Sequence, residues 1–151
     1  MQIYIGVSTH KGWFSKLIRW CTNSPVSHAF AVIPTQTDFV VIHAAGLKVH
    51  ALDFCMFKTQ NEIYKLYEIS ITDEKVRWLW HETGKPYGML SLFGYAYMLI
   101  NRKFGRKVKN PLADNEKTFV CSELIAKMLD IPSPETITPQ DLLTMMESRS
   151  L

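Results

Sequence analysis

The sequence predicts an α+β domain in which a small antiparallel sheet packs against helices. Runs rich in β-branched and aromatic residues are separated by short turns, as in neighbouring strands. Segments with apolar residues at three- and four-residue spacing, as in amphipathic helices, lie before and after these runs. The chain has 151 residues, 47% of them hydrophobic, which suits one compact core. Residues 1–151 are therefore assigned to a single domain.

Strands are expected at residues 3–7, 27–33, 39–44, 47–52 and 62–71. The short polar turn from Pro34 to Asp38 predicts that the second and third of these pair as a hairpin.

Helices are expected at residues 13–21, 73–83, 89–101 and 120–130, with a last helix that opens at Thr138-Pro139. Thr72 and Thr138 are suitable N-caps. The segment 89–101 is apolar nearly all round, which predicts a buried core helix. A charged loop is expected from Arg102 to Glu116.

Cys121 falls in the first turn of the helix expected at 120–130. Unpaired backbone N–H groups and the helix dipole at that position favour a thiolate, and therefore a nucleophile. The competing interpretation is a core cysteine, because Cys121 shares a helical face with Leu124, Ile125 and Met128.

His28 and His43 lie on the two strands of the expected hairpin, each within an apolar run. Hairpin partners can bring such side chains together, and a thiol hydrolase needs a base and a group that orients the base. A zinc site of His28, His43 and Cys121 is the weaker alternative, because no CxxC or HxxxH spacing supports it. The remaining histidines are expected on the surface or in loops, with His10 the best candidate to line a cleft.

Four motifs occur in an order that resembles the circularly permuted papain-like cysteine hydrolases, the branch of the NlpC-type superfamily that includes lecithin–retinol acyltransferase-like enzymes. The motifs are Ser-His-Ala-Phe around His28, Val-Ile-His-Ala around His43, Gly-Lys-Pro-Tyr-Gly ending at Gly88, and Phe-Val-Cys-Ser-Glu-Leu around Cys121. In the ordinary papain order the cysteine comes first, whereas here it comes last. The resemblance covers roughly residues 1–130.

The resemblance implies a permuted papain-like fold with the nucleophile at a helix N-terminus. It implies Cys121 as nucleophile, His28 as base and His43 as the orienting residue, with Ser27 and Tyr87 in the substrate cleft. Many relatives carry glutamate at the place of His43, and aspartate often follows the turn tyrosine where Gly88 stands here. The Cys121 backbone N–H is the simplest oxyanion-hole donor.

Composition limits the partners. The net charge of +3 and the pI near 8.7 do not require nucleic acid, and none is expected. A basic cluster at residues 102–109 predicts at most weak contact with an anionic membrane surface. The sequence does not indicate an oligomeric state, and no cofactor or metal is expected.

The sequence predicts neither a signal peptide nor a membrane span. Three separated cysteines fit a reducing compartment, so the expected location is cytoplasmic or phage-associated. Small proteins of the resembled family are frequent in bacteria and their phages.

The function expected from these observations is a cysteine peptidase or amidase that cleaves an amide bond, with peptidoglycan peptides as the leading substrate class. One alternative is a thiol acyl hydrolase or transferase that acts on lipid esters or amides. Another is a catalytically silent binding or structural protein with the same fold.

Overall fold

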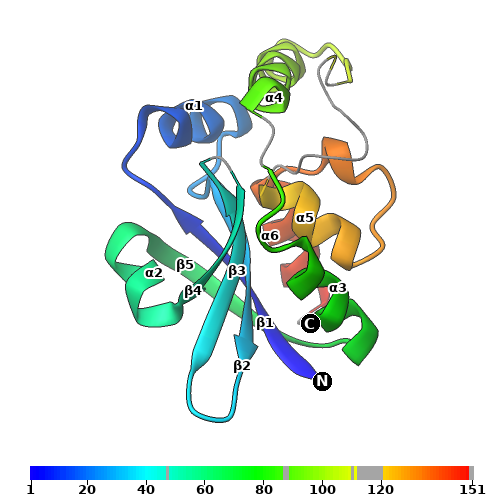
Figure 1. Cartoon of the computed structure of the whole chain (residues 1–151). Helices are drawn as coiled ribbons and strands as arrows, with labels where there is room; N and C mark the ends of the chain where they lie inside the picture. The colour runs from blue at the N-terminus through cyan, green and yellow to red at the C-terminus, as the bar shows by residue number, and fades with distance from the viewer. Residues whose placement is uncertain (47, 87–88, 110, 112–120, 150–151) are drawn as a thin grey trace.

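The computed structural model describes residues 1–46, 48–86, 89–109, 111 and 121–149. At its centre is a five-stranded sheet in the order β4-β3-β2-β1-β5, with every neighbouring pair antiparallel (Figure 1). The strands are β1 Gln2–Thr9, β2 His28–Pro34, β3 Phe39–Ala45, β4 Lys48–Asp53 and β5 Glu62–Ser70. The predicted α+β class and the β2–β3 hairpin are confirmed.

The helices are α1 Trp13–Thr22, α2 Phe54–Gln60, α3 Asp73–Glu82, α4 Met89–Lys103, α5 Cys121–Met128 and α6 Pro139–Arg149, with a 3-10 turn at Pro134–Thr136. Helices α3, α5 and α6 lie on one side of the sheet and α2 lies on the other, while α1 and α4 lie together beyond one end of it (Figure 1).

The alternation of side chains along β2 builds both faces of the sheet. Ala29 and Ala31 face the main core, where they join Leu124 of α5. Phe30 points to the opposite face and packs on Phe57 of α2, with ring centroids 4.5 Å apart. Gly6 on β1 makes room for the Phe30 ring, because a Cβ at that position would lie 2.1 Å from Phe30 Cζ.

Helix α2 was not predicted from the sequence. Asp53 caps this helix, and its Oδ1 accepts hydrogen bonds from the backbone N–H groups of Cys55 and Met56 at 2.8 and 3.1 Å. An aspartate before Phe54-Cys55-Met56-Phe57 was the available signal, but a seven-residue helix has too little apolar periodicity to stand out.

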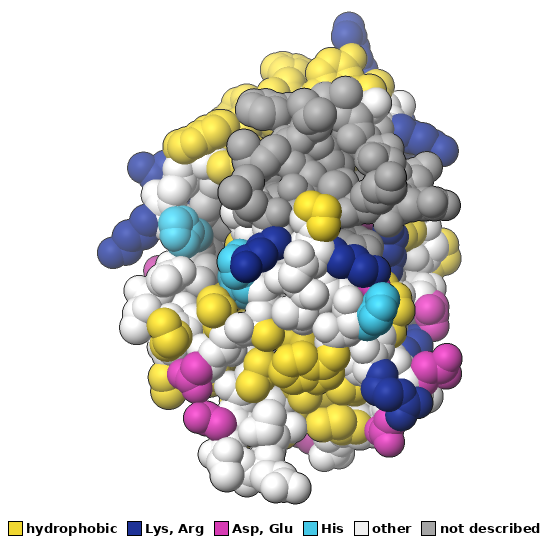
Figure 2. All heavy atoms as spheres, in the orientation of Figure 1, with side chains coloured by type: hydrophobic (Ala, Val, Ile, Leu, Met, Phe, Trp, Pro, Cys, Tyr) yellow, Lys and Arg dark blue, Asp and Glu magenta, His cyan; other side chains and the backbone are white. Residues whose placement is uncertain are grey.

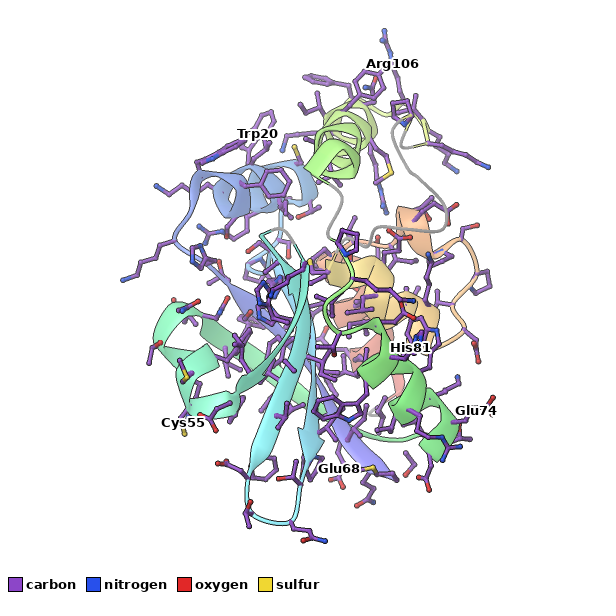
Figure 3. The ribbon with its side chains drawn as sticks, in the orientation of Figure 1. Trp20, Cys55, Glu68, Glu74, His81 and Arg106 are labelled. Atoms are coloured by element: carbon purple, nitrogen blue, oxygen red, sulfur yellow. The ribbon has the colours of Figure 1, made fainter. Side chains whose placement is uncertain are left out.

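The two predicted threonine caps are confirmed. Thr72 Oγ1 accepts the N–H of Lys75 at 3.4 Å at the start of α3, whose Glu74 and His81 point outward (Figure 3). At the start of α6, Asp141 N–H donates to Thr138 Oγ1 at 3.0 Å, and Thr138 N–H donates to Asp141 Oδ2 at 2.9 Å. This reciprocal arrangement is a capping box.

The prediction that the apolar helix is buried all round is wrong for the side chains described in α4. Met98 and Leu99 are buried, but Tyr97 is 52% exposed and Ile100 is 37% exposed. Hydrophobic side chains gather along the upper edge of the molecule, over α1 and α4 (Figure 2). One face of α4 packs on α1 and the other faces solvent.

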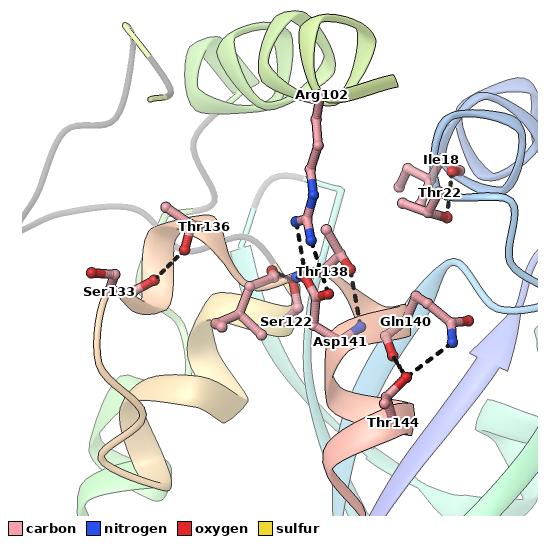
Figure 4. Close-up of polar contacts among 11 residues, drawn as sticks. Ile18, Thr22, Arg102, Ser122, Ser133, Thr136, Thr138, Gln140, Asp141 and Thr144 are labelled. Carbon is pink, nitrogen blue, oxygen red and sulfur yellow. Dashed lines mark hydrogen bonds and ion pairs between the residues drawn. The ribbon is translucent and has the colours of Figure 1, made fainter. Parts of the chain in front are cut away.

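Polar contacts join α4, α5 and α6 on the side where α5 begins (Figure 4). Arg102 of α4 makes a two-bond contact with the Asp141 carboxylate, with both N···O distances 3.1 Å. Ser122 Oγ donates to the Ile137 carbonyl at 2.6 Å. These bonds position the first turn of α5, which carries the cysteine.

Candidate active site

Cys121 lies in the first turn of α5, as predicted, and its side chain is almost fully buried. It packs in an apolar cluster with Ile18 and Cys21 of α1 and with Met98 and Leu99 of α4. The Cys121 sulfur also makes a backbone hydrogen bond with Ala29, the residue after His28. The thiol is therefore in apolar packing and beside the first residues of β2 at the same time.

His28 and His43 contact each other directly. His28 Nε2 lies 3.0 Å from His43 Nδ1, and the two rings meet edge to face. The β2–β3 register explains the contact. Ala31 pairs with Ile42, so one further step sets His43 opposite Phe30, and His28 lies on the diagonal. The predicted approach of His28 to His43 is confirmed.

Aromatic rings hold this pair on the α2 side of the sheet. The ring centroid of Phe57 lies 5.0 Å from that of His43 and 6.1 Å from that of His28. Phe30 stacks on His28 with a centroid separation of 6.5 Å. This packing fixes the plane of the His28 ring. With Nε2 facing His43, Nδ1 is the nitrogen that remains for another partner.

Cys121, His28 and His43 all line one cleft of about 390 Å³. Ser27, predicted as a cleft residue, lines it and is held by a 2.6 Å hydrogen bond between its hydroxyl and that of Ser15. His10 also lines the cleft, as predicted. Tyr87, the other predicted cleft residue, lies outside the described residues.

Most residues of the cleft wall were not predicted from the sequence. One side is apolar and comes from Trp13, Phe14 and Ile18 of α1, whereas Gln60 and Asn61 supply polar groups elsewhere in the lining. Their only sequence signal was the position of α1 directly after β1. Which face of α1 turns to the site depends on its packing against α4.

A basic hollow of about 620 Å³ shares His10, Gln60 and Asn61 with the cleft. Lys11, Lys16, Arg19 and Lys58 line it, with Glu62 as its one acidic residue. The cleft is thus bordered by an apolar wall and by a cationic region.

His50 is not the surface or loop residue that was expected. It lies on β4, paired with His43 in the β3–β4 register, and its ring centroid is 5.7 Å from that of His43. Its Nε2 lies 3.1 Å from the Ala45 carbonyl oxygen. The placement of His50 beside His43 could not be predicted, because the sequence pattern does not specify the register of β4.

Burial sets the protonation states of the site. Burial raises the pKa of the Cys121 thiol to about 11, although backbone hydrogen bonds with Ala29, Ser122 and Cys121 itself oppose the rise. Burial, and then the nearby His43 and His10, hold the pKa of His28 well below its ordinary value of 6.5. Burial and then His50 lower the pKa of His43 to about 4. At neutral pH the site therefore contains a thiol and two neutral imidazoles.

The thiolate expected from the helix start is thus not the resting state. The helix N-terminus favours negative charge, but removal of the sulfur from water by α1 and α4 outweighs that effect. A neutral His28 that keeps a free Nδ1 lone pair carries its proton on Nε2 and donates it to His43 Nδ1. His43 then carries its own proton on Nε2, an atom that is buried and has no hydrogen-bond partner among the described residues.

We expect Cys121 to react slowly with iodoacetamide at pH 7. Its alkylation rate should rise about tenfold per pH unit towards pH 11, because only the thiolate attacks. Cys55 lies on α2 and points outward (Figure 3), so it serves as the internal standard for accessibility. Peptide mass spectrometry after timed quenching measures both rates. Complete labelling of Cys121 below pH 7, ahead of Cys55, would show instead a stable thiolate–imidazolium pair.

Within the described ranges, no three His, Cys, Asp or Glu side chains converge as metal ligands. The zinc alternative required His28 and His43 to share a metal, whereas their ring nitrogens face each other at hydrogen-bond distance. No helix in the described part of the chain is long and apolar enough to cross a bilayer.

The geometry of the cleft and the chemistry of its residues carry the functional argument. No family model matches the sequence, and a search of curated proteins finds no match either.

Proposed function

We propose that this protein is a cysteine hydrolase in which Cys121 is the nucleophile, His28 the base and His43 the residue that orients His28. The observation that carries the proposal is a cleft lined by both Cys121 and His28, with His28 Nε2 already hydrogen-bonded to His43. The order of His28, His43 and Cys121 in the chain resembles that of the permuted papain-like hydrolases. This resemblance supports these three catalytic roles and a permuted papain-like fold.

In the proposed reaction, His28 Nδ1 takes the thiol proton as the Cys121 sulfur attacks the carbonyl carbon of the substrate. The oxyanion is stabilised at the start of α5, where backbone N–H groups have no intrahelical acceptor. The tetrahedral intermediate then expels an amine or alcohol, which takes the proton from His28. Water, activated by His28, hydrolyses the thioester and releases the acid.

The neutral resting state favours proton transfer during attack over a preformed thiolate. A thiol whose pKa is near 11 contributes little thiolate at neutral pH. A His28 with a lowered pKa is available as a base over a wide pH range. The Nε2–H bond to His43 supports the developing imidazolium and fixes the ring.

The cleft wall favours a substrate with an apolar acyl group. Trp13, Phe14 and Ile18 provide apolar lining, while the basic hollow next to the cleft suits an anionic head group. We therefore place lipid esters or amides first. Amide bonds of peptidoglycan peptides are the second candidate, favoured by the polar groups of His10, Gln60 and Asn61 and by the family resemblance.

The test is a panel of substrates incubated with purified protein and with the Cys121→Ser variant. The panel contains short-chain acyl esters and amides, anionic phospholipids and peptidoglycan peptides, with products followed by mass spectrometry. We expect Cys121-dependent release of a fatty acid and a covalent acyl adduct on Cys121. Cys121-dependent cleavage of peptides alone would select the second candidate. The absence of turnover and adduct across the panel would favour the silent binding protein.

A further inference from the structure

The outer face of α1 and α4 carries a group of exposed apolar side chains, named here the α1–α4 face. Trp13 and Trp20 on α1 are 71% and 54% exposed, Tyr97 and Ile100 on α4 are 52% and 37% exposed, and Phe104 directly after α4 is 72% exposed. Residues 13 and 20 lie on one helical stripe, and residues 97, 100 and 104 lie on another. Because α1 packs against α4, the two stripes belong to one end of the molecule.

Contacts of Lys103 join the two stripes. Its Nζ lies 4.4 Å from the centroid of the Trp20 ring and donates a 2.5 Å hydrogen bond to the Trp20 carbonyl. The end of α4, and with it Phe104, therefore lies beside Trp20. Figure 2 shows hydrophobic side chains along this edge, and Figure 3 shows Trp20 and Arg106 projecting from the same end.

The two helices that form this face carry charge of one sign. Residues 1–37 and 83–113, which include α1 and α4, contain no Asp or Glu. The same region supplies Lys16, Arg19, Lys103, Arg106, Lys107 and Lys109. Lys and Arg beside exposed Trp, Tyr and Phe are the side chains that sit well at an anionic membrane surface, where rings enter the interface and cations meet head groups.

We propose that the α1–α4 face docks on an anionic lipid bilayer. The site lies within reach of that surface, because Trp13 belongs both to this face and to the apolar wall of the cleft. Docking delivers an acyl chain from the bilayer along α1 to Cys121. The lipid substrate class inferred in this way rests on the proposed hydrolase function, whereas the docking itself does not.

The positive charge of the α1–α4 face favours an anionic bilayer over a second copy of this chain as its binding partner. A second copy of this chain, placed face to face, would bring like charges together. On an anionic surface, each Lys or Arg held near the lipid raises the partition coefficient of the protein by about fivefold.

The experiment measures co-sedimentation of the full-length Cys121→Ser variant with large vesicles of phosphatidylcholine containing 30% phosphatidylglycerol. Against this background, Trp20→Ala with Phe104→Ala removes two rings that do not line the cleft. We expect the double variant to bind at least tenfold more weakly. The matched control is Phe39→Ala with Trp80→Ala, two rings of 43% and 41% exposure on β3 and α3, which should leave binding unchanged.

Three outcomes would overturn the docking proposal: no sedimentation with anionic vesicles, equal loss in both double variants, or equal binding to pure phosphatidylcholine. Preferential binding of the α1–α4 face to RNA, in competition with vesicles, would also overturn it. Failure of the two proposals is distinguishable. Vesicle binding without any Cys121-dependent turnover would support docking and contradict the hydrolase proposal. Turnover of soluble short-chain esters without vesicle binding would support the hydrolase proposal and contradict docking.

Discussion

Replacing His28 with alanine is expected to lower the hydrolytic rate by about 10⁴-fold. The size of the loss follows from the neutral thiol. A buried Cys121 with a pKa near 11 would depend on a base at the moment of attack, and His28, the proposed base, lines the same cleft. The measurement is kcat/KM on the substrate found in the panel, compared between the wild type and His28→Ala.

Two comparisons separate lost catalysis from lost folding. His81→Ala removes an exposed imidazole from α3 and should retain wild-type activity. The double variant His28→Ala with Cys121→Ala should be no slower than Cys121→Ala alone, because nucleophile and base act as one unit. A folded His28→Ala protein with more than a tenth of wild-type activity would contradict the assignment of His28 as the base.

The sequence was sufficient for the β2–β3 hairpin and for the histidine pair. Two runs rich in β-branched and aromatic residues, joined by the short turn that ends at Asp38, predict this hairpin, and the hairpin brings His28 to His43. The helix N-caps at Thr72 and Thr138 could also be predicted, since each depends only on residues within one helical turn. These features depend on neighbours in the sequence, and they were predicted correctly.

Features determined by packing between distant segments were not. The thiol pKa was expected to fall because of the helix start, but Ile18 and Leu99, which bury Cys121, lie far from it in the chain. The exposure of Tyr97 was missed because an apolar sequence is the same whether one face or two faces are covered. The position of His50 beside His43 required the β4 register, which the sequence pattern does not specify.

Acidification from pH 6.5 to pH 4 is expected to destabilise the folded protein through its buried histidines. The folded-state pKa of His43 is about 4, because burial and His50 disfavour the charged form, whereas the ordinary value is 6.5. Between these values the unfolded chain binds a proton that the folded state excludes. Stability is therefore full above pH 6.5 and falls as the pH drops, by about 3 kcal/mol at pH 4 for His43.

His28 contributes in the same direction, since burial also holds its pKa well below 6.5. Asp141 does not account for the effect. Burial alone would raise the pKa of its carboxyl, but the hydrogen bonds from Arg102 and Thr138 lower it below 3.8, so Asp141 titrates beneath this window. The expected acid sensitivity follows from packing both imidazoles against Phe57, where the charged form of each ring is disfavoured.

Urea unfolding at pH 7, 5.5 and 4 measures this effect in the wild type and in His43→Gln, which keeps a polar side chain but removes a titrating group. We expect His43→Gln to be less stable at pH 7 and to lose less stability on acidification than the wild type. His81→Gln, a change on the outer side of α3, should follow the wild-type curve. Parallel curves of unfolding free energy against pH for His43→Gln and the wild type would show that His43 keeps an ordinary pKa in the folded protein. The assignment of two neutral histidines to the site would then be wrong.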